Sequence, residues 1–387
     1  MMIHAVGSNT EGFHLFRCSF GLILMSNTIT NPQSDLLDEL CGQLSASAGQ
    51  WKGVSHWPAE SLKRCGDAGV FRWFVPTKQG GFGWNDRDQT EGYLKLAEVD
   101  LVTTFVITQY MGAIRRIAAS ENQQVAQGWL DRLMNGDQFA TVGISHLTTS
   151  RRHLKEPALK AVEDNGGYRL VGMSPWVTGG AYADLLVVGA TLDDGRQVLV
   201  AVPGDAEGVQ AKQGCELVAL SASCTDQVLF DQVWVDPSMI LGGPMENVLS
   251  SGVGARPGGL QTSTLAVGLS MAAAKYLEGE SAARNDLAEP AARLTAEIIS
   301  LRDRLLSACD GPTAVDASQI RADANRLVLR STQAALMAAK GAGFVQGHPV
   351  GRWCQQALFF LVWSCPQPIS HAHLCELTNV PPALDLG

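Results

Sequence analysis

The sequence has no CxxC pair, and its nine cysteines show no regular spacing; they stand at positions 18, 41, 65, 215, 224, 309, 354, 365 and 375. Structural zinc sites usually contain closely spaced cysteine pairs, and disulfide frameworks are typical of small cysteine-dense secreted chains, so neither is expected here. The chain also contains no apolar run long enough to span a membrane. This pattern predicts reduced, mostly buried thiols in a cytoplasmic protein without a membrane partner.

Positive charge is in deficit, because 29 lysines and arginines stand against 38 aspartates and glutamates, a net charge of −9. Nucleic acids and anionic membranes attract basic surfaces, so this balance argues against general binding to either. Internal repeats and low-complexity tracts are missing too. What remains is a chain of 387 residues with 46% hydrophobic residues, enough for two or three packed layers or subdomains with a large core.

The first residues carry little structural signal. The apolar segment FGLILM, residues 20–25, is too short for a secretory signal and lacks a cleavage pattern. The polar stretch SNTITNPQSD follows Met25. We interpret residues 1–24 as an upstream extension of the translated frame and expect residues 1–34 to be disordered, the alternative being an ordered N-terminal arm.

Three regions differ in the period of their apolar residues. Residues 35–137 have apolar spacings of three and four, which predict an N-terminal helical domain. Residues 138–245 contain short β-branched runs separated by turns, which predict a central antiparallel β domain. Residues 246–387 return to helical spacing and predict a four-helix bundle. The fold class expected from this order is α+β.

Five local motifs lie in order along these regions: PTKQGGFGW (76–84), MNGDQFATVGIS (134–145), NGGYRLVGMSPWVTGGAYADLLVVGAT (165–191), SASCTDQVLFDQVWVDPSMILG (221–242) and KGAGFVQGHPVGRWCQQA (340–357). Each resembles a segment of the acyl-CoA dehydrogenase family, and together they cover nearly all of residues 35–370. The resemblance implies a flavoprotein oxidoreductase that acts on CH–CH groups. It also implies FAD between the β domain and the C-terminal bundle, with part of the cofactor reaching a neighbouring subunit.

Four residues match positions at which the family contacts the flavin ring. Trp176 and Thr178 match a Trp and a Thr at its edge, where an aromatic ring and a hydroxyl or amide suit the cofactor. Ile144 and Ser145 match positions that face the pyrimidine end. Without this resemblance, Trp176 would be interpreted as an ordinary core tryptophan.

A loop that supports the flavin pyrophosphate in the family is replaced here by SHLTTSRR, residues 145–152. Arg151 and Arg152 stand where the family has Ser-Asp. Guanidinium groups fit phosphate oxygens well, so Arg151 is a candidate phosphate ligand. A solvated basic turn is the alternative, and the sequence leaves both open.

Two further positions match residues that reach a partner subunit's cofactor. They are Arg284, after the first bundle helix, and Gly341, in the Gly-Ala-Gly segment. The neighbouring family residues are changed, with Leu287-Ala288 for Phe-Gly and Lys340 for a glycine. The resemblance nevertheless implies a homodimer or homotetramer.

The catalytic glutamate of the family is missing. Ser364 falls on its position, and GRWCQQALFFLVWSCPQPIS, residues 351–370, contains no acid. Ser364 could not act as that base without an activating partner. We expect the helix to stop at Pro366 and Pro368. The other family position for the base falls near Gly258, in a stretch that also lacks an acid.

Histidines are the remaining candidates for a base, since their pKa lies near neutrality. His146 stands next to Ser145, where the family has Glu, and His371 and His373 follow the prolines. The alternative is that they are polar loop residues, and Glu376 is expected to be a surface residue.

Three functions fit these observations. The first is dehydrogenation of an acyl thioester on CoA or an acyl carrier, as in fatty acid metabolism, with an altered base and an electron-transfer partner. The second is a flavin-dependent monooxygenase of the same fold, supplied with reduced flavin by a reductase. The third is a non-catalytic flavin-binding relative. Fold alone does not decide among them.

Overall fold

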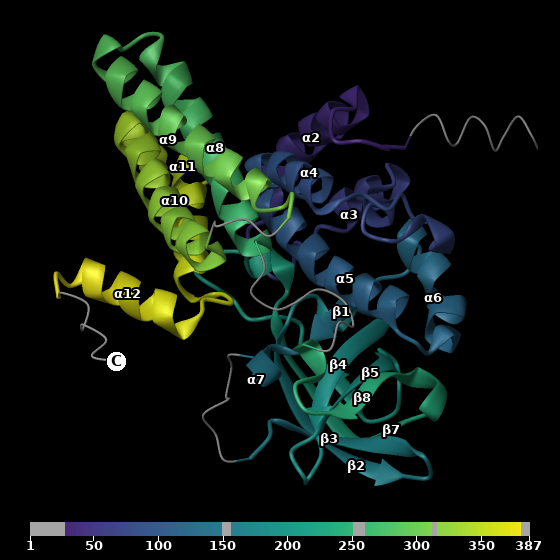
Figure 1. Cartoon of the computed structure of the whole chain (residues 1–387). Helices are drawn as coiled ribbons and strands as arrows, with labels where there is room; N and C mark the ends of the chain where they lie inside the picture. The colour runs from purple at the N-terminus through teal and green to yellow at the C-terminus, as the bar shows by residue number, and fades with distance from the viewer. Residues whose placement is uncertain (1–27, 149–155, 251–259, 312–315, 381–387) are drawn as a thin grey trace, which may run out of the picture.

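The computed structural model describes residues 28–148, 156–250, 260–311 and 316–380 (Figure 1). The predictions for Arg151, for Gly258 and for residues 1–27 lie outside these ranges. The N-terminal domain consists of α2 (Asp35–Ser47), α3 (Ala59–Asp67), α4 (Asp86–Val99), α5 (Leu101–Ala119) and α6 (Gln123–Asn135).

Local signals in the sequence explain where these helices begin and end. Asp100 caps α5, since its side chain accepts a hydrogen bond from the Thr103 backbone N–H. Gly136 ends α6 in a left-handed conformation, with φ of 77°, which glycine adopts without strain. Helix α5 is buried over most of its length and forms the centre of the domain.

Residues 28–34, which were expected to be disordered, belong to the described fold. Ile29 is fully buried, and its carbonyl accepts a hydrogen bond of 3.0 Å from the Trp73 indole N–H. The Trp84 indole donates to the Thr30 carbonyl at 2.9 Å. Residues 28–34 are therefore part of the helical domain, because these two tryptophans bind their backbone.

One eight-stranded sheet forms the middle domain: β1 (Ala140–Gly143), β2 (Leu159–Asp164), β3 (Gly167–Val177), β4 (Leu185–Thr191), β5 (Gln197–Pro203), β6 (Val209–Ala211), β7 (Asp226–Val235) and β8 (Ile240–Met245). The strand order is β6-β7-β3-β2-β4-β5-β8, and β1 pairs with β4. Most pairs are antiparallel, as predicted, but β1 and β2 each run parallel to β4. All four residues of β1 are buried, which suits a parallel strand covered by α5.

The C-terminal domain has the four expected helices, α8 (Gln261–Ser281), α9 (Ala288–Ser307), α10 (Ala317–Ala339) and α11 (Pro349–Val362). A further helix, α12 (Gln367–Leu377), contacts α10 but is not aligned with the four bundle helices (Figure 1). Helix α11 ends at Val362, and Ser364 is left-handed, with φ of 44°. Pro366 and Pro368 begin α12 instead of merely ending α11, because the first turn of a helix does not need their missing N–H.

The three domains pack on one another around α4, α5 and α8. Helix α4 packs along α8 of the bundle, and α5 packs against β1 of the sheet (Figure 1). The α+β architecture predicted from the sequence is thus confirmed. The region where these elements converge is where the sequence placed the cofactor.

Candidate functional site

A cavity of about 370 Å³ lies where the three domains meet. Its walls come from α4, α5, the end of β1, β3, the start of α8, the residues after α9 and the end of α11. This volume is within the range of small-molecule sites in proteins. Among the residues predicted to be functional, Ile144, Ser145, Trp176 and Ser364 all line this cavity.

Trp176 presents a large aromatic surface to the cavity. It is 46% exposed although it stands in β3. Its backbone has a φ of 56°, a value that residues other than glycine rarely adopt. The Ser145 hydroxyl donates a hydrogen bond of 2.8 Å to the carbonyl of Pro175, directly before Trp176. This contact links the two segments that the resemblance assigned to the flavin ring. An exposed indole of this kind suits a flat aromatic ligand.

Thr178 does not line the cavity among the described residues. It is 1% exposed, and its hydroxyl is 2.9 Å from the Thr225 hydroxyl, which is 2.8 Å from that of Ser223. These buried hydroxyls satisfy one another. The Thr178 side chain is therefore used inside the protein, and a contact with flavin would need its backbone.

Arg284 and Gly341 lie together, away from this cavity. The Arg284 guanidinium donates a hydrogen bond of 2.6 Å to the Ala338 carbonyl and lies 3.5 Å from the Glu280 carboxylate. Gly341 belongs to the 3₁₀ helix η9 (Lys340–Phe344), which follows α10. Arg284 thus fastens the end of α10 to the turn after α8, and the partner-cofactor role predicted for both residues stays a prediction.

The structure places Ser364 on the cavity wall, where the resemblance placed the family glutamate. Next to it, Trp363, the residue that follows α11, also lines the cavity. Within the described part of the chain, Asp86 is the sole carboxylate on the cavity wall. Asp86 is exposed in the first turn of α4, after Asn85, whose side chain caps the helix by accepting a hydrogen bond of 2.8 Å from the Asp88 N–H. Sequence reasoning missed Asp86, because acids in a first helical turn are common.

His146 does not reach the cavity in the described structure. The side chain is 6% exposed, and its Nε2 lies 2.7 Å from the Gly189 carbonyl oxygen. Burial lowers the pKa of His146 below its usual value, and the hydrogen bond to Gly189 acts in the opposite sense. The side chain is a neutral donor inside the sheet domain, and the geometry does not favour it as the base.

The other two histidines stand on α12 and not in a loop. His373 is buried, with its Nδ1 3.7 Å from the Glu376 carboxylate. Glu376 also pairs with Arg326 of α10 at 2.5 Å and is half exposed, as expected of a surface residue. These contacts hold α12 against the bundle, and the walls of the cavity do not include His371 or His373.

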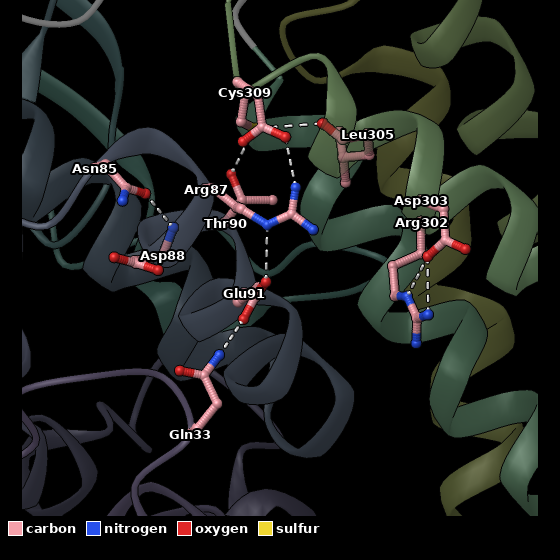
Figure 2. A network of polar contacts seen from close by, with 11 residues as sticks. Gln33, Asn85, Arg87, Asp88, Thr90, Glu91, Arg302, Asp303, Leu305 and Cys309 are labelled. Carbon is pink, nitrogen blue, oxygen red and sulfur yellow. Dashed lines mark hydrogen bonds and ion pairs between the residues drawn. The ribbon is translucent and has the colours of Figure 1, made fainter.

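A polar network at the rim of the cavity joins α4 to the end of α9 (Figure 2). Arg87 lies 3.3 Å from Glu91 and 2.6 Å from Asp310, which follows α9. The Thr90 hydroxyl is 3.3 Å from the Cys309 thiol, and both residues line the cavity. The network therefore fixes the part of α4 that carries Asp86.

Four polar residues on α4, α5 and α8, which we name the donor cluster, line the cavity wall: Tyr93, Arg115, Arg116 and Gln261. Arg116 is 3% exposed, and burial, together with the charge of Arg115, lowers its pKa to about 10. Burial raises the pKa of the Tyr93 hydroxyl, while the charge of Arg115 and the Gln261 side chain act in the opposite sense. The four side chains are thus close enough to influence one another electrostatically. Sequence patterns gave no sign of this cluster.

No helix within the described ranges is both long and apolar enough to cross a membrane.

No model of a protein family matches the chain. Curated proteins do resemble it. "Probable acyl-CoA dehydrogenase YngJ" of Bacillus subtilis is 22% identical over 329 residues, covering 79% of this chain and 85% of that protein. Mitochondrial isovaleryl-CoA dehydrogenase of Bos taurus is 26% identical over 212 residues, covering 50% of this chain and 47% of that one.

Solved structures share the fold. Glutaryl-coenzyme A dehydrogenase in complex with glutaryl-CoA has a TM-score of 0.75 at 18% identity, covering 90% of this chain and 96% of that chain. Butyryl-CoA dehydrogenase from Megasphaera elsdenii has a TM-score of 0.71 at 17% identity, covering 88% and 98%. PigA with FAD and proline has a TM-score of 0.72 at 15% identity, covering 90% and 98%. In its sequence the chain is thus similar to acyl-CoA dehydrogenases at low identity, and it shares their fold.

Proposed function

We propose that this protein is an FAD-dependent oxidoreductase whose reaction takes place in the cavity between the three domains. The observation that carries the proposal is that Trp176 of the β domain and Ser364 of the bundle line the same cavity. The exposed Trp176 ring, Ile144 and Ser145 would hold the flavin ring, and FAD would supply the capacity to accept a hydride. The residues present on this wall therefore fit the cofactor.

The reaction we favour is α,β-dehydrogenation of an acyl thioester, on CoA or on an acyl carrier protein. Such a reaction needs a group that removes the proton next to the carbonyl. Ser364 lacks a basic atom with a suitable pKa, and His146 faces Gly189. We assign proton removal to Asp86, because it is the carboxylate on the cavity wall among the described residues.

A flavin-dependent monooxygenase is the second candidate, and one observation favours it. Among the described residues, the wall at Ser364 has no carboxylate, and a monooxygenase that receives reduced flavin from a separate reductase needs none there. PigA, which shares the fold, was solved with FAD and proline. A non-catalytic flavin-binding relative is the outcome in which neither reaction is found.

We further propose that the protein is a homodimer or homotetramer of the cytoplasm. Exposed apolar side chains gather around the end of α10 and η9, where Met337 is 80% and Phe344 84% exposed. Apolar surface of this kind suits contact with a second copy. The dehydrogenase reaction would also need an electron-transfer partner, and the monooxygenase reaction a reductase.

The test is the visible spectrum of the purified protein, recorded without oxygen before and after addition of acyl-CoA thioesters. Bleaching of bound flavin is expected from the native protein, and Asp86→Asn should slow it at least a hundredfold. Asp88→Asn is the matched control, because Asp88 lies in the same helical turn but not on the cavity wall. Flavin that no thioester bleaches, but that a nicotinamide-driven reductase reduces, would favour the monooxygenase.

A further inference from the structure

The cavity wall is more polar than a tunnel for a plain hydrocarbon chain would be. Besides the donor cluster, amides and hydroxyls face the cavity from α4, α5 and α8, among them Gln89, Thr108, Gln109, Thr262 and Thr264. An alkyl chain placed against these groups would leave their hydrogen-bonding capacity unmet, at a cost for each group. The wall therefore favours a ligand that carries hydrogen-bonding atoms.

Positive charge is concentrated on one part of this wall. Arg115 and Arg116 are consecutive on α5 and both line the cavity. Arg116 is nearly fully buried, and its lowered pKa shows that burial and the adjacent cation disfavour its charge. A guanidinium on a cavity wall is stabilised when an anion binds to it, and Arg115 is half-buried there, next in sequence to the buried Arg116.

The described residues of the protein do not supply that anion to Arg115. Within the described ranges, Arg115 has no ion pair with a carboxylate. Asp86 lines the same cavity and lies near enough to Cys309 to influence it electrostatically, but no ion pair within the described ranges joins it to Arg115. Tyr93 adds a hydroxyl that is 4% exposed and forms no hydrogen bond of good geometry in the described structure. Arg115 and the Tyr93 hydroxyl are therefore donors without a described acceptor of good geometry, whereas Arg116 donates a hydrogen bond of 2.8 Å to the Gly112 carbonyl.

We propose that the donor cluster is a binding site for an oxyanion group, a carboxylate or phosphate, of a ligand in the cavity. Arg115 is the main contact, because guanidinium groups bind such oxyanions with two parallel hydrogen bonds, and Tyr93 and Gln261 complete the site. The inference rests on the proposed function in so far as the cavity is taken as the reaction site. The oxyanion is either an acidic substituent of the substrate or the phosphate of the flavin.

Two pairs of probes separate these sources, with binding measured calorimetrically on the purified full chain. Succinyl-CoA and butanoyl-CoA share CoA and a four-carbon acyl group but differ in a terminal carboxylate. FMN and riboflavin differ in a phosphate. The native protein should bind either succinyl-CoA more tightly than butanoyl-CoA or FMN more tightly than riboflavin. Arg115→Gln should reduce that ratio of affinities roughly ten- to hundredfold.

The control is Arg132→Gln, which removes a guanidinium of α6 that lies outside the cavity wall. Tyr93→Phe provides a second, milder variant, with an expected loss of several fold, should Arg115→Gln fail to fold. Loss of the succinyl preference identifies a substrate carboxylate, and loss of the FMN preference identifies the flavin phosphate. If Arg115→Gln and Tyr93→Phe leave both preferences as in the native protein, the site proposal is wrong. The proposed function has a separate readout, the bleaching of flavin by thioesters.

Discussion

Gly268 on α8 lies so close to α4 that a Cβ atom added to it would come within 2.7 Å of the Ala97 Cβ. The same atom would be 2.9 Å from the Leu94 carbonyl oxygen, so neither side chain nor backbone offers room. Both helices also line the cavity, through Tyr93 on α4 and Gln261 on α8. The spacing that Gly268 permits therefore sets the distance between two walls of the site.

Substitution of Gly268 should consequently destabilise the fold. We expect Gly268→Ala to lower the free energy of unfolding by about 1–3 kcal/mol, because the added methyl group forces α4 and α8 apart. Gly279→Ala, on the same helix with no atom within 4 Å of its Cβ position, should raise it by about 0.5–1 kcal/mol. Urea unfolding followed by circular dichroism measures both. Equal effects of the two substitutions would contradict the close packing.

Removal of the Trp176 ring should weaken flavin binding without unfolding the protein. We expect Trp176→Ala to reduce the affinity for FAD roughly tenfold, the loss associated with one aromatic stacking contact. Trp234→Ala is the matched control, since Trp234 is a similarly exposed tryptophan of the same sheet, 43% against 46%, and does not line the cavity. Titration of FAD by fluorescence compares the two. Equal affinities would show that Trp176 does not contact the cofactor.

A carboxylate restored at position 364 should compensate for loss of Asp86. If proton removal depends on Asp86, the double variant Asp86→Asn, Ser364→Glu should recover at least a tenth of the native bleaching rate, because Ser364 lines the same cavity. The rate is followed anaerobically with the thioester that bleaches native flavin fastest. Asp86→Asn with Ser364→Gln keeps the size of the side chain without the charge, and recovery in this variant would rule out a role for the carboxylate.

Stability should fall in mild acid because of His146. Its pKa is lowered in the folded protein, so between that pKa and about 6.5 the unfolded chain binds more protons. The free energy of unfolding therefore decreases as the pH falls below about 6.5, by up to about 1.4 kcal/mol per pH unit for one histidine. His373, whose pKa is also lowered by burial and which faces Glu376 and Arg326, adds to the same trend.

His146→Gln should flatten this dependence, because the amide can still donate to the Gly189 carbonyl and does not titrate. Urea unfolding at pH 7.5, 6.5 and 5.5 measures the slope for the native protein, for His146→Gln and for the exposed-site control His371→Gln. A slope that His146→Gln leaves as steep as in the native protein would show that His146 does not bind the proton.

The order of the domains was predicted from the spacing of apolar residues. This spacing depends on local burial and can be followed residue by residue in the sequence. The assignment of Ile144, Ser145, Trp176 and Ser364 to the site followed from the resemblance; all four line one cavity, and their roles stay predictions. The parallel pairing of β1 with β4 could not be predicted in this way, since strand direction depends on residues far apart in sequence.

The donor cluster and Asp86 were missed for a related physical reason. Arg115 and Arg116 stand near the C-terminal end of a mainly apolar helix. Basic residues are common at this position because their charge interacts favourably with the helix dipole, so they do not indicate a binding site. Their placement in a cavity depends on how α5 is covered by α4 and α8. Similarly, the partner of His146 is a carbonyl in β4, which no local pattern identifies.

The parallel ladder between β1 and β4 has a consequence for how the chain acquires its fold. Ala140 pairs with Leu185 and Gly143 with Val188, so β1 has no strand partner until β4 has been synthesised. Closing such a long loop costs entropy and slows the formation of non-local pairs. As the polypeptide leaves the ribosome, α5 is therefore complete before the sheet that covers it. The nascent chain must keep this apolar helix from aggregating until the ladder closes.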